Sequence, residues 1–203
     1  MTNTYFITGI GTGIGKTVVS AILTEKLQAD YWKPIQSGDL DISDSLFVNN
    51  LISNNKSVVH PEKYRLSQPL SPHLSARLDG IQIELSVLKA PLTNTNLIIE
   101  GAGGLMVPLN DKELILDLIK MLNPKVIVIS QNYLGSINHT LLTLEILKAN
   151  NVQVAGLIFN GTGNAESEDY IEKYSGVKII GRVPSLSIID KEAIKKAGEN
   201  ISL

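Results

Sequence analysis

The stretch from Tyr5 to Leu23, YFITGIGTGIGKTVVSAIL, decides the fold of this chain. It consists of a short apolar run, a glycine-rich turn and a second apolar run, which predicts a strand, a loop and a helix in direct succession. A glycine-rich loop that ends Gly15-Lys16-Thr17 between a strand and a helix is typical of a cradle for nucleotide phosphates. A glycine-rich turn that binds nothing is the alternative, and the complete strand–loop–helix setting disfavours it.

The chemistry of such a loop assigns roles to its residues. Its glycines let consecutive backbone N–H groups turn toward phosphate oxygens, and the start of the following helix adds positive charge. Lys16 is expected to reach the β- and γ-phosphates, and Thr17 is expected to offer a hydroxyl to Mg²⁺. Five residues separate Gly9 from Gly15, where the standard loop has four, and Gly11 offers a shorter register.

Length and composition indicate one globular domain over residues 1–203, with 43% hydrophobic and 19% charged residues. A net charge of −2 gives no support for a surface that binds nucleic acid or an acidic membrane. The lack of cysteine excludes disulfides and cysteine nucleophiles. Neither a secretion signal nor a bilayer-spanning apolar run is found in the sequence, so we expect a cytoplasmic protein.

Strand and helix signals alternate along the chain, which predicts an α/β fold with a mostly parallel sheet flanked by helices. The expected strands are dense in Val, Ile and Leu, as in strands buried on both faces, and comprise residues 5–8, 31–33, 96–100, 125–130, 152–159 and 177–180. The expected helices comprise residues 16–28, 43–51, 85–90, 112–121, 137–150, 167–174 and 190–198. The proline-containing stretch 54–80 is expected to be a surface excursion that covers a ligand.

Ligands of open α/β sheets bind at the carboxyl ends of the strands, so the residues that follow each strand are informative. Lys33 follows one strand and is suited to neutralise a transferred phosphoryl group, although these residues alone favour an ordinary surface lysine. Three carboxylates come next, Asp39, Asp41 and Asp44, and each is a candidate to hold Mg²⁺. Asp44 or Ser43 is equally suited to cap the following helix, so the local sequence leaves this choice open.

Further polar residues follow the later strands. Glu100 closes an apolar strand, which is the usual position of a Mg²⁺-binding acid in enzymes with a phosphate loop, and the glycines of EGAGG at 100–104 let the backbone approach a ligand closely. Asn160 can pair with both edges of a purine, although Asn-Gly is also a common turn. The helix expected from residue 137 offers its N-terminus to a carboxylate. The three histidines lack metal-ligand spacing, so no zinc site is expected.

These residues together resemble the dethiobiotin synthetase family over nearly the whole chain. The motifs that carry the resemblance are FITGIGTGIGKT at 6–17, KPIQSG at 33–38, SD at 43–44, SPH at 71–73, EGAGG at 100–104, PL at 108–109, LGSINH at 134–139 and Asn160. The five-residue gap in the loop is itself typical of the family, whereas Gly13 stands where many members have an acid. The resemblance implies the three-layer P-loop NTPase sandwich.

The resemblance implies an ATP-dependent cyclo-ligase of biotin biosynthesis. Such an enzyme forms a carbamate from CO₂, derived from bicarbonate, and 7,8-diaminopelargonate. The carbamate oxygen attacks the γ-phosphate of ATP, and the neighbouring amine then closes the ureido ring and expels phosphate. ATP is the co-substrate and Mg²⁺ the metal, with no organic prosthetic group.

The resemblance also implies a role for individual residues. The expected catalytic residues are Lys33, Lys16 and Thr12. The expected Mg²⁺ ligands are Thr17, Asp44 and Glu100, which selects Asp44 from the three candidate aspartates. Contacts to ATP are expected from Gly13, Ile14, Gly15, Lys16, Thr17, Val18, Asp44, Glu100, Gly101, Ala102, Gly103, Asn160, Gly161 and Pro184. Contacts to the second substrate are expected from Ser37, Pro72, Gly103, Gly135, Asn138 and Tyr170.

The family forms homodimers, so the resemblance implies that the segment Gly135–Asn138, and Tyr170, are supplied across a subunit interface.

Two other functions are alternatives to the synthetase. A related amidotransferase would need an ammonia source, and the chain has no cysteine and no room for a glutaminase domain. A partitioning-type ATPase switch usually carries a second lysine in the loop, where Gly11 stands here, and often a basic or amphipathic surface segment.

Overall fold

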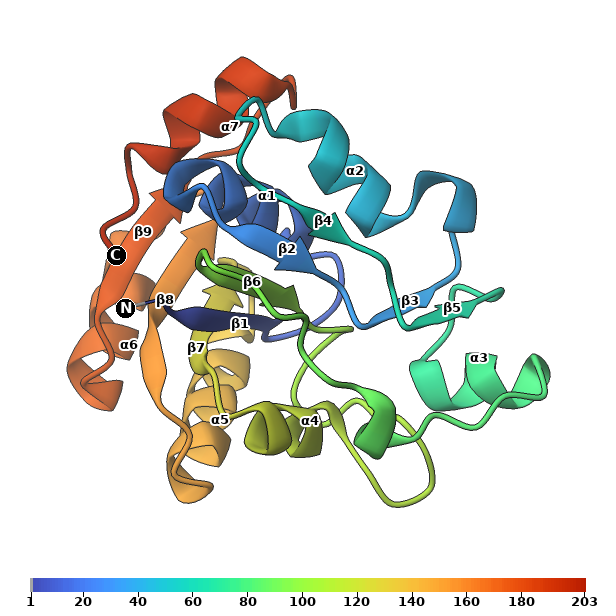
Figure 1. Ribbon diagram of the computed structural model, residues 1–203. Coiled ribbons are helices and arrows are strands. Elements are labelled where there is room, and N and C mark those ends of the chain that lie inside the picture. The colour runs from blue at the N-terminus through green and yellow to red at the C-terminus, as the bar shows by residue number, and fades with distance from the viewer. Residues whose placement is uncertain (1) are drawn as a thin grey trace.

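A seven-stranded sheet in which every neighbouring pair is parallel forms the centre of the computed structural model, which describes residues 2–203 (Figure 1). The strands lie in the order β4 (Val59–His60), β2 (Asp30–Trp32), β6 (Leu97–Glu100), β1 (Thr4–Gly9), β7 (Lys125–Ser130), β8 (Val154–Asn160) and β9 (Ile179–Val183). Strand β1 is therefore central, with β6 on one side and β7 on the other.

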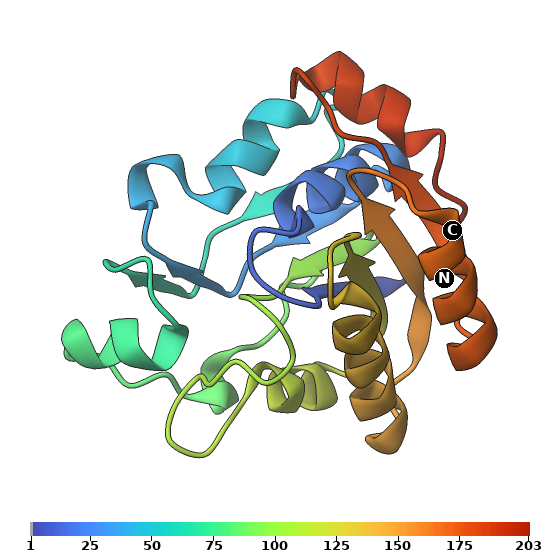
Figure 2. The same cartoon turned by 180° about the vertical axis from the view of Figure 1, so that it is seen from behind.

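Helices cover both faces of this sheet (Figures 1 and 2). One face carries α1 (Lys16–Leu27), α2 (Asp44–Leu51) and α7 (Lys191–Gly198), and the other carries α4 (Ile115–Leu122), α5 (Ser136–Ala149) and α6 (Ala165–Ser175). A small two-stranded sheet, β3 (Ile35–Ser37) with β5 (Tyr64–Leu66), lies to one side with α3 (Pro72–Leu78). Two short 3-10 turns, Leu40–Ile42 and Leu85–Val87, complete the regular structure of residues 2–203.

Alternation along the strands divides the core into two layers. On β1, Phe6 packs toward the layer of α4, α5 and α6, whereas Ile7 packs toward the layer of α1, α2 and α7. On β6, Ile99 and Ile98 divide in the same way. Because both faces of the central strands are covered, their sequences are continuously apolar rather than alternating.

The predicted α/β class and parallel sheet are confirmed, and most elements lie within a few residues of their expected bounds. The helix expected at residues 85–90 is wrong: only the 3-10 turn Leu85–Val87 forms. Pro91 opposes a longer helix, because it disfavours helical backbone at Ala90 and has no N–H to bond to the carbonyl of Val87. Within residues 2–203, no helix combines the length and apolar character that crossing a membrane requires.

The excursion expected at residues 54–80 is more ordered than the sequence analysis predicted. It contains β4, which extends the main sheet, and β5, which pairs with β3. Helix α3 begins at Pro72, in the first-turn position where proline is favoured, after Ser71. Pro69, Leu70 and Ser71, in the turn between β5 and α3, line a cavity together with residues that follow the strands of the main sheet.

Candidate active site

A cavity of about 840 Å³ lies at the carboxyl ends of β1, β2 and β6. It brings together many residues that are distant in sequence and were predicted to function together, namely Thr12, Gly13, Gly15, Lys16, Thr17, Val18, Lys33, Ser37, Asp44, Pro72, Glu100, Ala102 and Gly103. The sheet order explains this convergence. Because β6 lies between β1 and β2, the phosphate loop, Glu100 and the segment after Trp32 reach the same edge of the sheet.

The glycine-rich loop has a backbone that only glycine adopts readily. Gly15 precedes α1 with φ 90°, and a Cβ at this position would lie 2.1 Å from Nδ2 of Asn160. Asn160, at the end of β8, donates from that Nδ2 to the carbonyl of Ile14 at 3.0 Å. Glycine at position 15 therefore permits both the left-handed turn and the close approach of Asn160.

Lys16 lies inside the loop that it is expected to serve. Its Nζ donates to the carbonyl of Gly11 at 2.8 Å, and the side chain is buried. Burial lowers the pKa of Lys16 to about 8, an effect that the nearby Glu100 carboxylate partly opposes. Phosphate oxygens beside this amine would favour its charged form.

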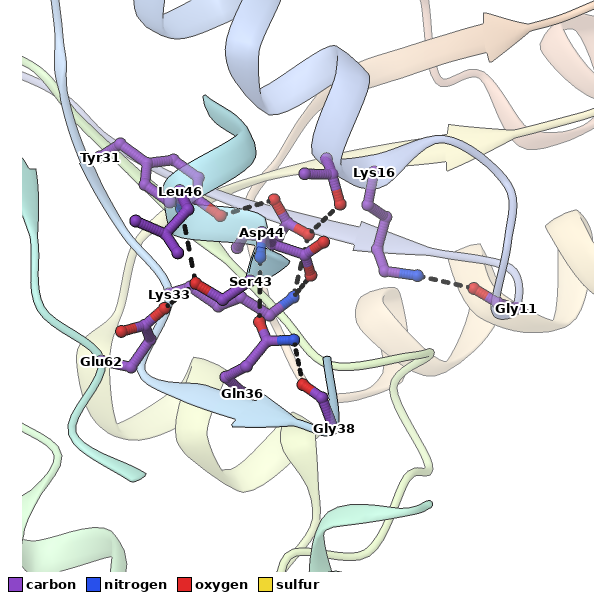
Figure 3. A network of polar contacts seen from close by, with 12 residues as sticks. Gly11, Lys16, Tyr31, Lys33, Gln36, Gly38, Ser43, Asp44, Leu46 and Glu62 are labelled. Atoms are coloured by element: carbon purple, nitrogen blue, oxygen red, sulfur yellow. Dashed lines mark hydrogen bonds and ion pairs between the residues drawn. The ribbon is translucent and has the colours of Figure 1, made fainter. Parts of the chain in front are cut away.

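Lys33 forms the centre of a buried ionic cluster (Figure 3). Its Nζ lies 3.0 Å from Oε1 of Glu100 and 2.5 Å from Oδ2 of Asp44. Burial works against the charged amine, but the two carboxylates outweigh burial and raise the pKa of Lys33 above its ordinary value. Lys33 is therefore a fixed ammonium group, not the mobile surface lysine that the local sequence favoured.

Glu100 receives hydrogen bonds on both carboxylate oxygens. Its Oε1 accepts from Oγ1 of Thr17 at 2.8 Å and from Lys33, while its Oε2 accepts from the hydroxyl of Tyr31 at 2.9 Å. The side chain is only 1% exposed, so these donors replace water as its hydrogen-bond partners. Such a complete set of donors stabilises a buried charge.

Asp44 is left free to face the cavity because its neighbours provide the cap of α2. Ser43 is the N-cap and accepts from the N–H of Leu46, and its hydroxyl donates to Glu62 at 2.8 Å. Gln36 accepts from the N–H of Asp44 at 3.3 Å and donates to the carbonyl of Gly38 at 2.9 Å. The local sequence allowed either Ser43 or Asp44 to cap this helix, and the structure shows that Ser43 is the cap.

The donor chemistry of the cavity fits Mg²⁺. Thr17 and Glu100 are in direct contact, and Lys33 contacts both Glu100 and Asp44, so one hydroxyl and two carboxylates converge. Mg²⁺ prefers oxygen ligands and usually takes one or two carboxylates, with water and substrate phosphates filling the remaining positions. Within residues 2–203, no group of three or more His, Cys, Asp or Glu side chains is placed to hold a metal.

Several predicted residues lie outside this cavity. Gly161 and Pro184 line a second cavity of about 580 Å³ beside β8 and β9, and Gly135 lines a third of about 470 Å³ at the start of α5. Asn138 is exposed in the first turn of α5. Tyr170 lines none of these cavities and stacks on Tyr174, with ring centroids 5.9 Å apart. A single chain therefore does not bring Gly135, Asn138 and Tyr170 to the main cavity.

Two further predicted ATP contacts, Ile14 and Gly101, do not line this cavity. Ile14 is buried beneath the loop, and Gly101 lies against the ring of Phe6, where a Cβ would come within 2.7 Å. Of the three candidate aspartates, Asp39 also lines the cavity, whereas Asp41 does not. Asp39 precedes a 3-10 turn and has no ionic contact with Lys33 among the pairs of residues 2–203.

Sequence reasoning missed two residues that hold the proposed metal ligands: Tyr31 bonds to the carboxylate of Glu100, and Gln36 bonds to the backbone N–H of Asp44. The sequence pattern predicts only an apolar strand at Tyr31 and a family motif that includes Gln36. The alternation of side chains on β2 gave a signal for Tyr31, because a residue two positions before Lys33 is expected on the same face. Nothing local indicated that Gln36 would reach Asp44, because that contact depends on how the chain turns between β3 and α2.

Comparison with known proteins places these features in a family. Residues 3–193 match the family described as AAA domain. The chain is 50% identical over 199 residues to the ATP-dependent dethiobiotin synthetase BioD of Christiangramia forsetii, covering 98% of this chain and 96% of the relative. It is 51% identical over 191 residues to that of Cytophaga hutchinsonii, covering 94% and 92%.

Solved structures show the same fold at low sequence identity. The cell division ATPase MinD of Pyrococcus furiosus has a TM-score of 0.65 at 14% identity, covering 98% of each chain. A ParA family ATPase of Chlorobium tepidum has a TM-score of 0.54 at 14% identity, covering 98% of this chain and 91% of the other. These likenesses identify a P-loop NTPase fold, whereas the near full-length identities are far more specific. The chain belongs to the ATP-dependent dethiobiotin synthetase family.

Proposed function

We propose that this protein is an ATP-dependent dethiobiotin synthetase, which joins CO₂ to 7,8-diaminopelargonate and closes the ureido ring with release of ADP and phosphate. The observation that carries the proposal is the convergence of the phosphate loop, Lys33 and Glu100 in one cavity. Phosphoryl transfer is catalysed mainly by positioning and by stabilising charge, and this cavity offers groups for both. An ATP-dependent step of biotin synthesis is consistent with the proposed cytoplasmic location.

In the proposed reaction, one substrate amine first binds CO₂ and loses a proton, which gives a carbamate. A carbamate oxygen attacks the γ-phosphorus, and the bond to the β–γ bridging oxygen breaks as ADP leaves. The neighbouring amine then attacks the carbonyl carbon of the mixed anhydride, and phosphate departs as the ring closes. Lys33 and Lys16 are assigned to the charge that develops on the transferred group, and Thr12 is assigned to the carbamate.

Thr17, Asp44 and Glu100 are the residues proposed to hold Mg²⁺. When bound, this ion would neutralise charge on the β- and γ-phosphates. The residues of the chain contribute a fixed arrangement, because Lys33 links Asp44 to Glu100 and Thr17 is bonded directly to Glu100.

The second substrate is proposed to lie beside Ser37, Pro72 and Gly103, which line the same cavity as the loop. Its carboxylate tail is proposed to reach the start of α5 on a partner subunit, near Gly135 and Asn138. A helix N-terminus favours an anion, and these residues lie apart from the main cavity within one chain. A homodimer would therefore complete the substrate site, and Tyr170 is proposed as a further contact across the interface.

The base of ATP is proposed to lie near Asn160, Gly161 and Pro184. The second cavity contains Gly161 and Pro184, and Asn160 contacts the phosphate loop directly. The amide oxygen of Asn160 can accept from the amino group of adenine while its Nδ2 holds Ile14. Gly101 and Ala102 are proposed to approach the nucleotide through their backbone.

A partitioning-type ATPase switch is the second candidate, and the likeness of the fold to MinD and ParA supports it. Gly11 in place of a second lysine and the near-neutral charge of the chain speak against it. The discriminating experiment measures phosphate release by the purified protein with Mg²⁺ and ATP. We expect diaminopelargonate plus bicarbonate to stimulate release and dethiobiotin to appear by mass spectrometry. No stimulation, together with tight ADP-dependent binding of a partner, would reject the synthetase.

A further inference from the structure

Tyr31 places a hydroxyl against the carboxylate of Glu100 from inside the core. Its side chain is 0% exposed, and the hydroxyl donates to Oε2 of Glu100 at 2.9 Å. The other oxygen, Oε1, accepts from Thr17 and Lys33 on the cavity side. The two oxygens of this one carboxylate therefore have separate sets of partners.

The register of two neighbouring strands explains this contact. Tyr31 on β2 is paired with Ile98 on the parallel strand β6, and Glu100 follows two residues later. Successive side chains of a strand point to opposite faces, so Tyr31, Ile98 and Glu100 share one face of the sheet. The length of the phenol ring lets its hydroxyl reach past Ile98 to the end of β6.

The hydrogen bond has the properties that a fixed support needs. Tyr31 is fully buried, so water does not compete with Glu100 for the hydrogen bond that its hydroxyl donates. The last torsion of a glutamate side chain has a broad energy profile, so the carboxylate needs an external partner to hold its plane. Fixing Oε2 from the core therefore also fixes the direction of Oε1.

We infer that Tyr31 is a positioning residue, whose hydrogen bond to Oε2 of Glu100 holds Oε1 toward Thr17 and the divalent metal of the nucleotide complex. The inference rests on the proposed function only in assigning the metal to Glu100. Partners that hydrogen-bond to metal ligands typically contribute about 10- to 100-fold in metal affinity or activity. Tyr31 stands in that relation to Glu100 without lining the cavity itself.

The variant Tyr31→Phe tests this inference, because it removes the hydroxyl and keeps the ring. Binding of Mn²⁺ in the presence of ADP, followed by electron paramagnetic resonance, reports on the metal site without turnover. We expect the Mn²⁺ dissociation constant to rise about tenfold. In turnover assays, the Mg²⁺ concentration at half-maximal rate should rise by a similar factor while the KM for diaminopelargonate stays constant.

Tyr5 offers a matched control. It is paired with Ile98 from the opposite side, on β1, and packs in the same layer of the core as Tyr31. Tyr5→Phe removes a hydroxyl from an equivalent position that is not bonded to Glu100. We expect Tyr5→Phe to bind Mn²⁺ as the unmodified protein does. In addition, Tyr31→Phe should weaken Mn²⁺ binding no further when it is combined with Glu100→Gln.

Equal Mn²⁺ affinity of Tyr31→Phe and the unmodified protein would overturn the inference, and so would equal weakening by both phenylalanine variants. If Tyr31→Phe does not fold, 4-aminophenylalanine at position 31 retains a donor and must bind Mn²⁺ as tyrosine does. Failure of the proposed function would look different. The unmodified protein would then make no dethiobiotin, while the Mn²⁺ comparison would still test Tyr31.

Discussion

At the scale of single residues, Lys33 organises the charge of the cavity. It is buried between Glu100 and Asp44, so its ammonium group is held by two carboxylates that would otherwise repel each other. A buried charge is stable only when it is paired and hydrogen-bonded, and the cluster meets this condition on both sides. This arrangement places a fixed positive charge beside the phosphate loop. The contacts that hold this charge come from Glu100 and Asp44, not from the loop.

Replacing Lys33 by alanine is expected to reduce kcat by about 100- to 1,000-fold, because a preorganised charge near the transferred group is lost. ATP affinity is expected to stay within a few-fold, since Lys16 and the loop backbone are unchanged. Steady-state kinetics and calorimetry with ADP measure the two quantities. Lys63→Ala, at an exposed position before β5, is the control and should change neither. Loss of ADP binding alone in Lys33→Ala would move Lys33 to the nucleotide pocket.

The sequence largely predicts which side chains meet at the site, because parallel strands bring their carboxyl ends to one edge of the sheet. This rule and the motifs indicate Glu100 and the phosphate loop, whereas Lys33 is favoured over an ordinary surface lysine only by the family resemblance. The supports of Glu100 and Asp44 were not found. Tyr31 and Gln36 act through contacts between different elements, and the sequence contains the alternation of each strand but not the register between them.

At the scale of elements, the junction between the phosphate loop and α1 is the most constrained. Gly15 has φ 90° and lies against Asn160. Gly15→Ala is expected to lower the free energy of unfolding by about 1–2 kcal/mol from left-handed strain, and more if Asn160 must move. ATP affinity should fall at least tenfold because the shape of the loop changes.

Gly176→Ala is the control for Gly15→Ala, because it introduces the same backbone strain without changing the shape of the phosphate loop. Gly176 follows α6 with φ 69°, and a Cβ there would meet no atom within 4 Å. This variant should show a similar loss in denaturant unfolding and unchanged ADP binding. Equal ADP affinities for the two variants would contradict the role given to Gly15.

The junction between α1 and the segment after α2 depends on Glu25. This carboxylate accepts from both the backbone N–H and the hydroxyl of Ser53, and from the backbone and side chain of Asn54. Burial favours its neutral form, but these hydrogen bonds outweigh burial and lower the pKa of Glu25 from 4.5 to about 2. Its contribution to stability is therefore complete above about pH 4.5 and is lost as the pH falls toward 2.

Glu25→Gln is expected to lower the free energy of unfolding by about 1.5–3 kcal/mol at pH 7, since an amide cannot accept all four bonds. Urea unfolding at pH 7 and pH 3 should show that the deficit shrinks at the lower pH. Glu145→Gln, on the exposed side of α5, provides the control with no deficit at either pH. A deficit of constant size would show that charge is not involved.

Element types followed from the sequence wherever a helix or strand had one long apolar pattern. The errors lie between residues 35 and 90, where elements are short. There, Pro91 ends a helical pattern early, and Pro72 starts a helix that was expected to be loop. Strands of two or three residues, such as β3, β4 and β5, are too short to show an alternation of apolar and polar residues. They form because neighbouring strands are available for pairing.

At the scale of the whole molecule, Gly135 lines a cavity separate from that of the phosphate loop, so the proposed substrate site needs a second chain. Leu134, beside the start of α5, is fully exposed, and Leu142 on the same helix is 55% exposed. In the proposed homodimer these side chains would be covered. Leu134→Asp would place an unpaired charge in that interface, which is strongly unfavourable.

We therefore expect Leu134→Asp to shift the protein from dimer to monomer in analytical ultracentrifugation and to raise the KM for diaminopelargonate at least tenfold. Leu92, in the loop that leads into β6, is equally exposed. Leu92→Asp is the matched control and should stay dimeric and active. A monomeric but fully active Leu134→Asp protein would show that the substrate site needs no partner.

The central position of β1 determines when the protein can become functional during its synthesis. Thr4 pairs with Leu97 and Tyr5 pairs with Lys125, so the first strand has no partner until much later parts of the chain exist. At usual rates of translation the delay is on the order of ten seconds. The nascent chain carries its phosphate loop from the start, yet the strand before that loop has both of its neighbours only after β7 has left the ribosome.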